Sequence, residues 1–327
     1  MPDEKLTAYR GGKALRRGWT TGSCAAAASQ AAAVLLLTGI APPEIHLHTP
    51  GGITFCLPVE DAHMSGNAAA CTVRKDAGDD PDITNGVRIT ASVRRIEKGV
   101  AIEGGAGVGR ITRPGLAMPV GEAAINPGPR QQITDAVHRA AEQNGYGGGF
   151  SVTISVEDGE ALAAQTYNGH LGIVGGISIL GTSGIVEPMS EKALVDTIRL
   201  ELDSLYAQGQ RIAFLCPGNY GADFARDTLG LDLERAVKCS NFIGEAFDHA
   251  AYRGYPEILL VGHAGKLVKM AAGVMNTHSS VADARQEIFT AHAALCGAPR
   301  ETLEGLMAAI SVDACVELLD EVNLRQP

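Results

Sequence analysis

The chain has 327 residues, of which 45% are hydrophobic and 20% are charged, and its formal net charge is −10. This length favours two domains, and the composition is that of a folded protein with a sizeable core. The negative charge argues against nucleic acid or an anionic membrane as a general partner, and the aromatic content of 5% argues against a base-stacking surface.

Seven cysteines are scattered along the chain, and none forms a Cys-x-x-Cys pair. This pattern predicts reduced thiols, most of them buried, and a cytoplasmic location. The longest apolar run, Ala25 to Leu37, is interrupted by Ser29 and Gln30 and is too short to span a bilayer. We therefore interpret it as an interior helix and expect no membrane partner.

The residues up to about Arg10 are polar and predict a loose start. Thr20, Thr21 and Ser23 then open an Ala-rich segment that ends in Thr-Gly, and their hydroxyls can cap it as a helix. A helix N-terminus suits a carboxylate or a phosphate, because it presents free N–H groups and partial positive charge. Capping alone explains the same hydroxyls, and these residues by themselves favour that interpretation.

Short alternating runs between residues 44 and 103 predict a small, mostly antiparallel sheet that packs on this helix. His46, His48 and His63 lie in this region. Their spacing does not match a metal site, since no cysteine or carboxylate completes a ligand set. We expect no protein metal site here or elsewhere.

The glycine-dense segment 104–109 lacks the context of a dinucleotide fingerprint and is interpreted as a flexible loop. Further on, Asn126-Pro-Gly-Pro-Arg130 leads into a helix predicted from Arg130 to Gln143. Asn126 and Arg130 are candidates to project polar groups into a cleft from this stiff turn. Capping and surface solvation are the alternative.

A glycine-punctuated apolar stretch, residues 169–190, is interpreted as the end of one domain and the start of the next, lining the cleft between them. Its β-branched run, residues 177–180, is typical of a short buried strand. A tight crossover without a ligand explains the stretch equally well. We place the boundary after Gly184, which gives domains 1–184 and 185–327.

After Ser190 helices and strands alternate, which predicts a parallel sheet with right-handed crossovers. The predicted fold class is therefore mixed α/β and α+β: an N-terminal two-layer α+β sheet domain and a C-terminal Rossmann-like parallel α/β domain. Ligands of such sheets bind at the carboxyl ends of the strands, where the turns 217–221 and 262–266 fall. Lys266 and Lys269 are spaced to share one helical face, which suits neighbouring carboxylates.

Six segments carry a family resemblance: Gly18-Trp-Thr-Thr-Gly-Ser-Cys-Ala-Ala-Ala, Ala124-Ile-Asn-Pro-Gly-Pro-Arg, Gly175-Gly-Ile-Ser-Ile-Leu-Gly-Thr-Ser-Gly-Ile-Val-Glu-Pro-Met-Ser, Pro217-Gly-Asn-Tyr-Gly, Gly262-His-Ala-Gly-Lys and Asn276-Thr-His-Ser. Together they resemble the CbiD family, in the family's order and over nearly the whole chain. Trp19, Ser23 and Gly128 are mild departures from the family's pattern.

The resemblance implies that S-adenosylmethionine donates a methyl group to C1 of cobalt-precorrin-5B, giving cobalt-precorrin-6A in anaerobic cobalamin (vitamin B12) biosynthesis. Cobalt would then arrive only as part of the tetrapyrrole substrate. Placing the donor methyl, the nucleophilic carbon and the leaving sulfur in line supplies much of the acceleration of such a transfer. Two alternatives stay open: a non-enzymatic tetrapyrrole carrier, and a nicotinamide-dependent tetrapyrrole oxidoreductase, for which the glycine fingerprint is missing.

On this interpretation the site residues form three sets. The residues expected to approach the donor are Gly175, Gly176, Gly181, Thr182, Ser183, Gly184, Gly218 and Asn219. Those expected to bind the tetrapyrrole and its carboxylates are Arg16, Arg17, Thr20, Thr21, Ser23, Arg130, Lys266, Lys269 and His278. His263 and Asn126 are the catalytic candidates, although the reaction demands little acid or base chemistry. The sequence leaves the oligomeric state open, a homodimer included.

Overall fold

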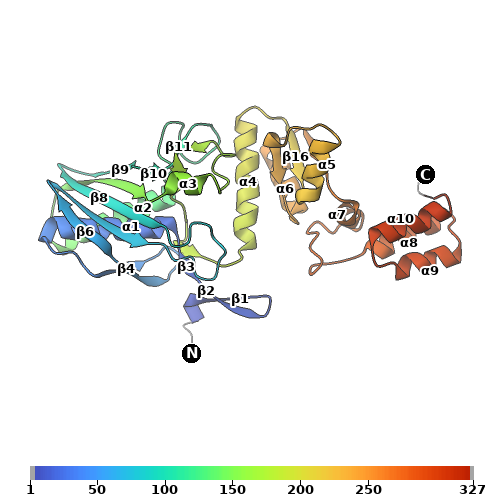
Figure 1. Ribbon diagram of the computed structural model, residues 1–327, viewed down its shortest axis with the longest axis horizontal. Coiled ribbons are helices and arrows are strands. Elements are labelled where there is room, and N and C mark those ends of the chain that lie inside the picture. Colours follow the sequence, from blue (N-terminus) through green and yellow to red (C-terminus); the bar gives the residue numbers. More distant parts are fainter. Residues whose placement is uncertain (1–3, 325–327) are drawn as a thin grey trace. The chain divides into compact units, whose positions relative to one another are not determined.

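The computed structural model describes residues 4–324, and the chain divides into two compact units, Met1–Ser190 and Glu191–Pro327. Both units contain helices and strands (Figure 1), so the protein has the mixed α/β composition that the sequence predicted. The division falls after Ser190, whereas the sequence analysis placed it after Gly184. Strand β15 (Ile185–Val186) pairs with β3 (Gly18–Trp19), which keeps these residues in the first unit.

Helix α1 (Thr21–Thr38) is the core of the first unit, and its predicted bounds are confirmed. The Thr20 hydroxyl accepts a hydrogen bond from the Ser23 backbone N–H, and Gly39 closes the helix at a φ of 76°. The helix is as long and apolar as a membrane-spanning one, but 83% of it is buried inside the unit. Its small alanine side chains let neighbouring elements approach on every side.

A five-stranded sheet packs on α1 in the order β6-β7-β8-β12-β9. Its strands are β6 (Glu60–Ser65), β7 (Ala68–Arg74), β8 (Arg88–Ile96), β12 (Gly149–Val156) and β9 (Val100–Gly104). All pairs are antiparallel except β12 with β9, which is parallel. Helix α2 (Pro127–Gln143) packs beside α1 (Figure 1), and it begins at Pro127 rather than at the predicted Arg130.

Two hairpins accompany this sheet. The first, β1 (Thr7–Arg10) with β2 (Lys13–Arg16), forms where the sequence predicted a loose start. The second, β4 (Glu44–His48) with β5 (Thr54–Pro58), confirms two predicted runs, but it forms a sheet of its own. Its inward side chains alternate with outward ones, as expected of a half-buried ribbon.

The segment 104–109, interpreted from the sequence as a flexible loop, is ordered by close backbone packing. Strand β10 (Gly107–Val108) pairs in parallel with β14 (Gly176–Ile177). A Cβ added at Gly107 would lie 2.0 Å from the Val156 carbonyl oxygen, so glycine is required there. The loop prediction was wrong because the glycines serve a close approach of two backbones and not freedom of movement.

The strand predicted over residues 177–180 is shorter than expected. Only Ile177 lies in β14, and Ile179 forms an isolated parallel bridge with Ile125. Leu180 is 49% exposed. The three small sheets β10–β14, β11 (Arg110–Ile111) with β13 (Ile173–Val174), and β15–β3 tie this part of the first unit together, with the short helix α3 (Gly159–Ala163) packed on β14.

The second unit holds a three-stranded parallel sheet in the order β17-β16-β18. Its elements are α4 (Glu191–Ala207), β16 (Ile212–Cys216), α5 (Asn219–Asp227), β17 (Ala236–Lys238), α6 (Ile243–Arg253) and β18 (Glu257–Leu260). In β16, Leu215 packs with α4 and α6. Its two neighbours in the strand, Phe214 and Cys216, pack with α5. Helices therefore cover both faces of the sheet, and the predicted alternation of helices and strands is confirmed.

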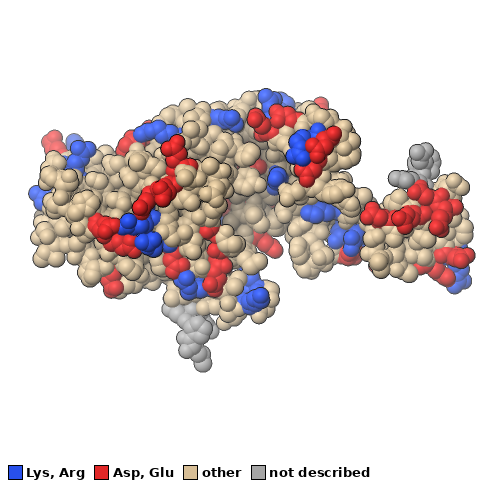
Figure 2. Space-filling model, viewed as in Figure 1, with Lys and Arg blue, Asp and Glu red and all other residues tan. Residues whose placement is uncertain are grey.

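The rest of the second unit is helical. The predicted helix after Gly265 is only α7 (Ala264–Leu267), followed by a 3₁₀ turn over Val268–Ala272. Helices α8 (Arg285–Leu295), α9 (Arg300–Ala308) and α10 (Val312–Glu321) pack around a small core of their own, which includes Ala293, Leu306 and Cys315. Acidic side chains gather on these helices on the face drawn in Figure 2.

Candidate functional site

In the first unit the glycine-punctuated stretch crosses the N-terminus of α1. The Thr21 hydroxyl accepts a hydrogen bond of 2.9 Å from the Leu180 backbone N–H, and the Ser23 hydroxyl donates one of 2.7 Å to the Gly184 carbonyl. A Cβ added at Gly181, whose φ is 122°, would lie 2.3 Å from the Thr20 Oγ1. The structure thus brings together the predicted hydroxyls and glycines, and it uses both to pack the stretch on the helix.

Beside this crossing lies a cavity of about 200 Å³. It is lined by Thr20, Thr21, Lys75, Asp82, Ile83, Thr84, Thr166, Asn168, Ile177, Ser178, Leu180 and Val186. Lys75, only 3% exposed, forms an ion pair with Asp82 and donates to the Thr84 hydroxyl over 2.6 Å. Burial raises the pKa of Asp82, but the Lys75 amine and Thr84 outweigh it and the net pKa is lowered. This pair carries no signal in the sequence, because neither residue belongs to a recognised motif.

The predicted basic residues of the first unit already have partners inside the protein. Arg16 holds Asp76 with two hydrogen bonds of 2.7 and 2.8 Å, and Arg17 holds Glu187 with two of 2.6 and 3.1 Å. Arg16 and Arg17 each lower the pKa of the carboxyl they hold.

Arg130 donates to the carbonyl oxygens of Ile125 and Ile102, at 2.9 and 3.2 Å, and lies 3.4 Å from Glu122. As folded, these three arginines organise loops. On the face drawn in Figure 2, Lys and Arg lie next to Asp and Glu rather than in one basic field.

The remaining first-unit candidates differ in access. Thr182 and Ser183 are exposed, and Gly175 is exposed with open space around it. Gly176 is buried in β14. Asn126 is the N-cap of α2, and its side chain makes no capping hydrogen bond, which leaves its amide free of that role.

In the second unit, four predicted residues meet at the carboxyl edge of the parallel sheet. Gly218, with a φ of 97°, is the N-cap of α5 after β16, and Asn219 is the first residue of that helix. A Cβ added at Gly218 would lie 3.5 Å from the Lys266 amine. His263 caps α7 through its Nδ1, which accepts from the Gly265 N–H over 3.1 Å, and its ring stands edge-on to Tyr220.

Lys238 joins this edge, although the sequence analysis did not propose it. It ends β17, and its amine donates to the Asn219 Oδ1 over 3.2 Å. Two amines, Lys238 and Lys266, therefore lie by the N-terminus of α5, and this combination suits an anionic group such as a carboxylate. The signal available in the sequence was its place as the last residue of a parallel strand.

Lys269 and His278 lie elsewhere in the second unit. Lys269 is buried, and its amine donates to the carbonyls of Thr277 and Ala282 and lies 3.9 Å from Asp283. It does not share an α-helical face with Lys266, because α7 ends at Leu267. His278 is exposed, and its Nδ1 lies 2.6 Å from the Ser280 hydroxyl.

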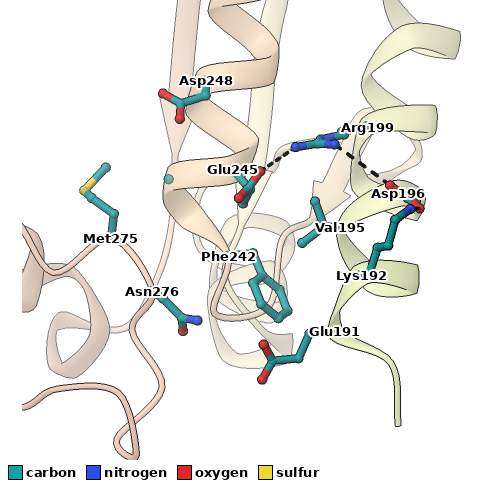
Figure 3. Close-up of a pocket in the computed structure, with 11 residues that line it drawn as sticks. Glu191, Lys192, Val195, Asp196, Arg199, Phe242, Glu245, Asp248, Met275 and Asn276 are labelled. Carbon is teal, nitrogen blue, oxygen red and sulfur yellow. Dashed lines mark hydrogen bonds and ion pairs between the residues drawn. The ribbon is translucent and has the colours of Figure 1, made fainter. Parts of the chain in front are cut away.

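The second unit also contains a cavity of about 530 Å³, which we call the α4–α6 pocket. It is lined by Glu191, Lys192, Val195, Asp196, Arg199, Phe242, Gly244, Glu245, Asp248, Met275 and Asn276. Figure 3 shows α4 and α6 on its two sides and the segment with Met275 and Asn276 closing a third. That segment is held by a bridge between Phe242 and Asn276 and by the Gly244 N–H donating to the Met275 carbonyl over 3.1 Å.

Only Asn276 of this lining belonged to a motif in the sequence. The charged residues of α4 and α6 were missed, because charges on amphipathic helices usually face solvent. Arg199 holds Glu245 at 2.6 Å and lies 3.9 Å from Asp196, which also pairs with Lys192. The first turns of α4 and α6 contribute to the lining, so the pocket belongs to the end of the unit where the parallel strands terminate.

One expectation about the histidines is wrong. The β4–β5 hairpin places Cys56 directly opposite His46, with Glu44 two residues along, and one ligand atom from each lies within 4.8 Å of the others. A cysteine and a carboxylate therefore do adjoin His46, because cross-strand pairing brings together residues that are distant in sequence. Glu44 raises the pKa of the Cys56 thiol. All three side chains are exposed.

A mixed α/β protein with a polar site at the edge of a small parallel sheet is a common enzyme architecture, and comparison with known sequences identifies the family. Residues 8–188 match the family model described as CbiD, and residues 276–327 match the one described as CbiD, C-terminal domain. The chain therefore belongs to the CbiD family, as the sequence motifs indicated.

Named relatives span most of the chain. A protein from Ruminiclostridium cellulolyticum is 53% identical over 316 residues, covering 97% of this chain and 82% of the relative. One from Citrobacter koseri is 44% identical over 328 residues, covering 99% of this chain and 86% of the relative. Both are named cobalt-precorrin-5B C(1)-methyltransferase. A solved structure, the cobalamin biosynthesis protein (cbiD) from Archaeoglobus fulgidus, is 29% identical and covers 88% of this chain and 92% of that chain, with a TM-score of 0.47.

Proposed function

We propose that this protein is an S-adenosylmethionine-dependent methyltransferase that methylates C1 of cobalt-precorrin-5B to give cobalt-precorrin-6A. The observation that carries the proposal is identity of 53% over 97% of the chain to a relative that bears this name. The aligned region covers 97% of this chain and therefore extends through both units. The cobalt is part of the substrate, and we place the reaction in the cytoplasm, within anaerobic cobalamin biosynthesis.

The proposed transfer is a direct displacement. The nucleophilic ring carbon forms the new bond to the methyl carbon, the S–CH₃ bond breaks, and its electron pair stays on sulfur, so the sulfonium becomes a neutral thioether. Holding the three reacting atoms in line is the main task of the protein. His263 and Asn126 remain candidates to contact reacting groups, and no proton transfer through them is required by this step.

We propose that the second unit is a small Rossmann-like domain whose carboxyl edge receives a carboxylate of the tetrapyrrole. Lys238 and Lys266 support this, because they place two amines beside the N-terminus of α5. Gly218 and Asn219, which the sequence analysis assigned to the donor, would then contact the acceptor. In the first unit, Thr182 and Ser183 are the exposed part of the glycine-punctuated stretch and are proposed to face a ligand.

The decisive experiment is anaerobic incubation with cobalt-precorrin-5B and methyl-labelled S-adenosylmethionine, followed by mass and carbon NMR analysis of the product. We expect the label at C1. Donor binding without transfer would point to a different acceptor macrocycle. Binding of the macrocycle without any binding of the donor would instead support a carrier function.

A further inference from the structure

The α4–α6 pocket carries more negative than positive charge. Its lining includes four carboxylates and two cations, a net charge of −2. Both cations are engaged, Lys192 with Asp196 and Arg199 with Asp196 and Glu245. Within residues 4–324, which the structure describes, Glu191 and Asp248 have no ion-pair partner. The pocket therefore holds carboxylate charge that the protein itself does not neutralise.

The uncharged part of the lining suits an organic ligand. Phe242 and Val195 provide an apolar wall, and Met275 adds a polarisable thioether. The Asn276 Oδ1 accepts from the His278 N–H over 3.2 Å, which leaves the side-chain NH₂ as a free donor. In Figure 3 the side chains of Glu191, Phe242 and Asn276 approach the same space. An aromatic ring, an amide and a carboxylate thus converge.

The volume and the charge of the pocket together restrict the class of ligand that it can bind. A volume of about 530 Å³ lies in the range of pockets for small molecules and cofactors. The unpaired carboxylates would repel a polycarboxylate tetrapyrrole. Negative groups held close together in a partly enclosed pocket destabilise each other's ionised form. A cation with a heteroaromatic ring and an amino-acid end matches the lining.

We propose that the α4–α6 pocket binds the methyl donor, S-adenosylmethionine. The Glu191 carboxylate then lies close to the sulfonium, and Phe242 packs against the adenine. This rests on the proposed function, since it names the site where that reaction's cationic substrate is held. The two substrates then occupy chemically distinct places in the second unit, the donor in an acidic pocket and a tetrapyrrole carboxylate at the basic edge of the sheet.

The same charges favour release of the product. S-adenosylmethionine carries a sulfonium charge that S-adenosylhomocysteine lacks, so each unpaired carboxylate stabilises the donor more than the product. Transfer of the methyl group thereby removes part of the attraction that held the ligand. The pocket is expected to prefer S-adenosylmethionine over S-adenosylhomocysteine, and to lose that preference when its carboxylates are neutralised.

The test is calorimetric titration of the full chain with each ligand. Glu191→Gln is expected to weaken S-adenosylmethionine binding by about fivefold, with a smaller effect on S-adenosylhomocysteine. Glu191→Gln with Asp248→Asn should abolish most of the preference for the donor. Glu257→Gln, which removes an exposed carboxylate at the start of β18 outside the pocket, is the matched control and should bind as the wild type does.

Two results would overturn the assignment while leaving the proposed function intact. One is unchanged donor affinity in the double variant with label still transferred to C1; the other is an equal loss in Glu257→Gln. Failure of the wild-type protein to bind any donor would instead overturn the function. Phe242→Leu, which keeps an apolar side chain, is a second variant in case neutralising the carboxylates unfolds the helix ends. It should weaken the binding of S-adenosylmethionine and of S-adenosylhomocysteine to the same extent.

Discussion

The amine of Lys238 donates a hydrogen bond of 3.2 Å to the Oδ1 of Asn219, which joins the end of β17 to the first residue of α5. Lys238 ends β17, and Asn219 follows the neighbouring parallel strand β16, so both lie at the same edge of the sheet. Asn219 therefore orients the Lys238 amine beside the α5 N-terminus, where an anion is favoured.

Lys238→Met is expected to weaken binding of the tetrapyrrole by about tenfold, because a charge-assisted hydrogen bond to a carboxylate is lost. Donor affinity should not change. Anaerobic absorbance titration with the macrocycle measures the first quantity and calorimetry the second. Lys98→Met, at an exposed position of the first unit, is the control. Equal tetrapyrrole affinity in both variants would contradict the role given to Lys238.

Gly181→Ala is expected to destabilise the first unit by roughly 3 kcal/mol, since it combines an unfavourable φ with a steric clash. Its φ is 122°, and the added Cβ would lie 2.3 Å from the Thr20 Oγ1. Gly175→Ala is the matched control, because its φ is 83° but nothing lies within 4 Å of the added atom. Urea unfolding of both variants separates backbone strain from crowding. A smaller loss in Gly181→Ala than in Gly175→Ala would count against the packing described.

Asp82→Asn is expected to cost about 3 kcal/mol near neutral pH, because it leaves the Lys75 ammonium buried without its counter-charge. Lys75→Met should cost less, since Asp82 keeps hydrogen bonds from the Thr84 hydroxyl and N–H. The folded-state pKa of Asp82 lies below its ordinary value. Its stabilising contribution is therefore present above the unfolded-state pKa and disappears as the pH falls through the folded-state pKa.

Denaturant titrations from neutral to acidic pH measure this dependence. The stability difference between the wild type and Asp82→Asn should shrink as the pH falls. A difference that stays constant down to the acid transition would mean that the carboxylate charge is not what stabilises Lys75.

The pKa of Glu201, on α4, is shifted in the opposite direction to that of Asp82. Burial raises its pKa to about 7, although Lys238 opposes the shift. The folded protein holds this proton more tightly than the unfolded chain does. Stability is therefore expected to fall as the pH rises from the ordinary carboxyl range towards 7, and to level off above it.

Glu201→Gln should consequently be more stable than the wild type at pH 8 and nearly equal to it at pH 4.5, since only the ionised carboxyl is penalised by burial. Unfolding at the two pH values by urea gives the comparison. Glu234→Gln, at an exposed position of the same unit, should show no such pH-dependent gain. A gain of the same size at both pH values would indicate a packing effect and not a titration.

Patterns local in sequence predicted the helices and strands well. Thr20, the alanine run and Gly39 specify α1 at both ends, and the elements from α4 to β18 follow from their alternation. Each of these signals lies within a few residues of the structure it specifies. Family membership likewise follows from short motifs, because their residues and spacing are specific.

Pairings that depend on the folded backbone were beyond such reasoning, whether the partners are 7 residues apart, as Lys75 and Asp82 are, or 170 apart, as Arg17 and Glu187 are. Lys75 with Asp82, Arg17 with Glu187 and Cys56 with His46 are juxtaposed only by the folded backbone. The structure of segment 104–109 could not be predicted either, since its glycines are equally compatible with a mobile loop and with a tight backbone crossing. The α4–α6 pocket arises from three separate segments, and no single one of them signals a cavity.

The pairing of β15 with β3 and the hydrogen bonds from residues 180–184 to the start of α1 have a consequence for biosynthesis of the chain. During translation α1 emerges early, whereas its covering stretch emerges only after more than a hundred further residues. The alanine-rich helix is therefore synthesised well before residues 180–184, which contact its N-terminus in the folded protein. Such non-local contacts form late and at a cost in loop-closure entropy. The second unit, built from neighbouring segments, carries no comparable delay, and the nascent first unit is where chaperones are expected to act.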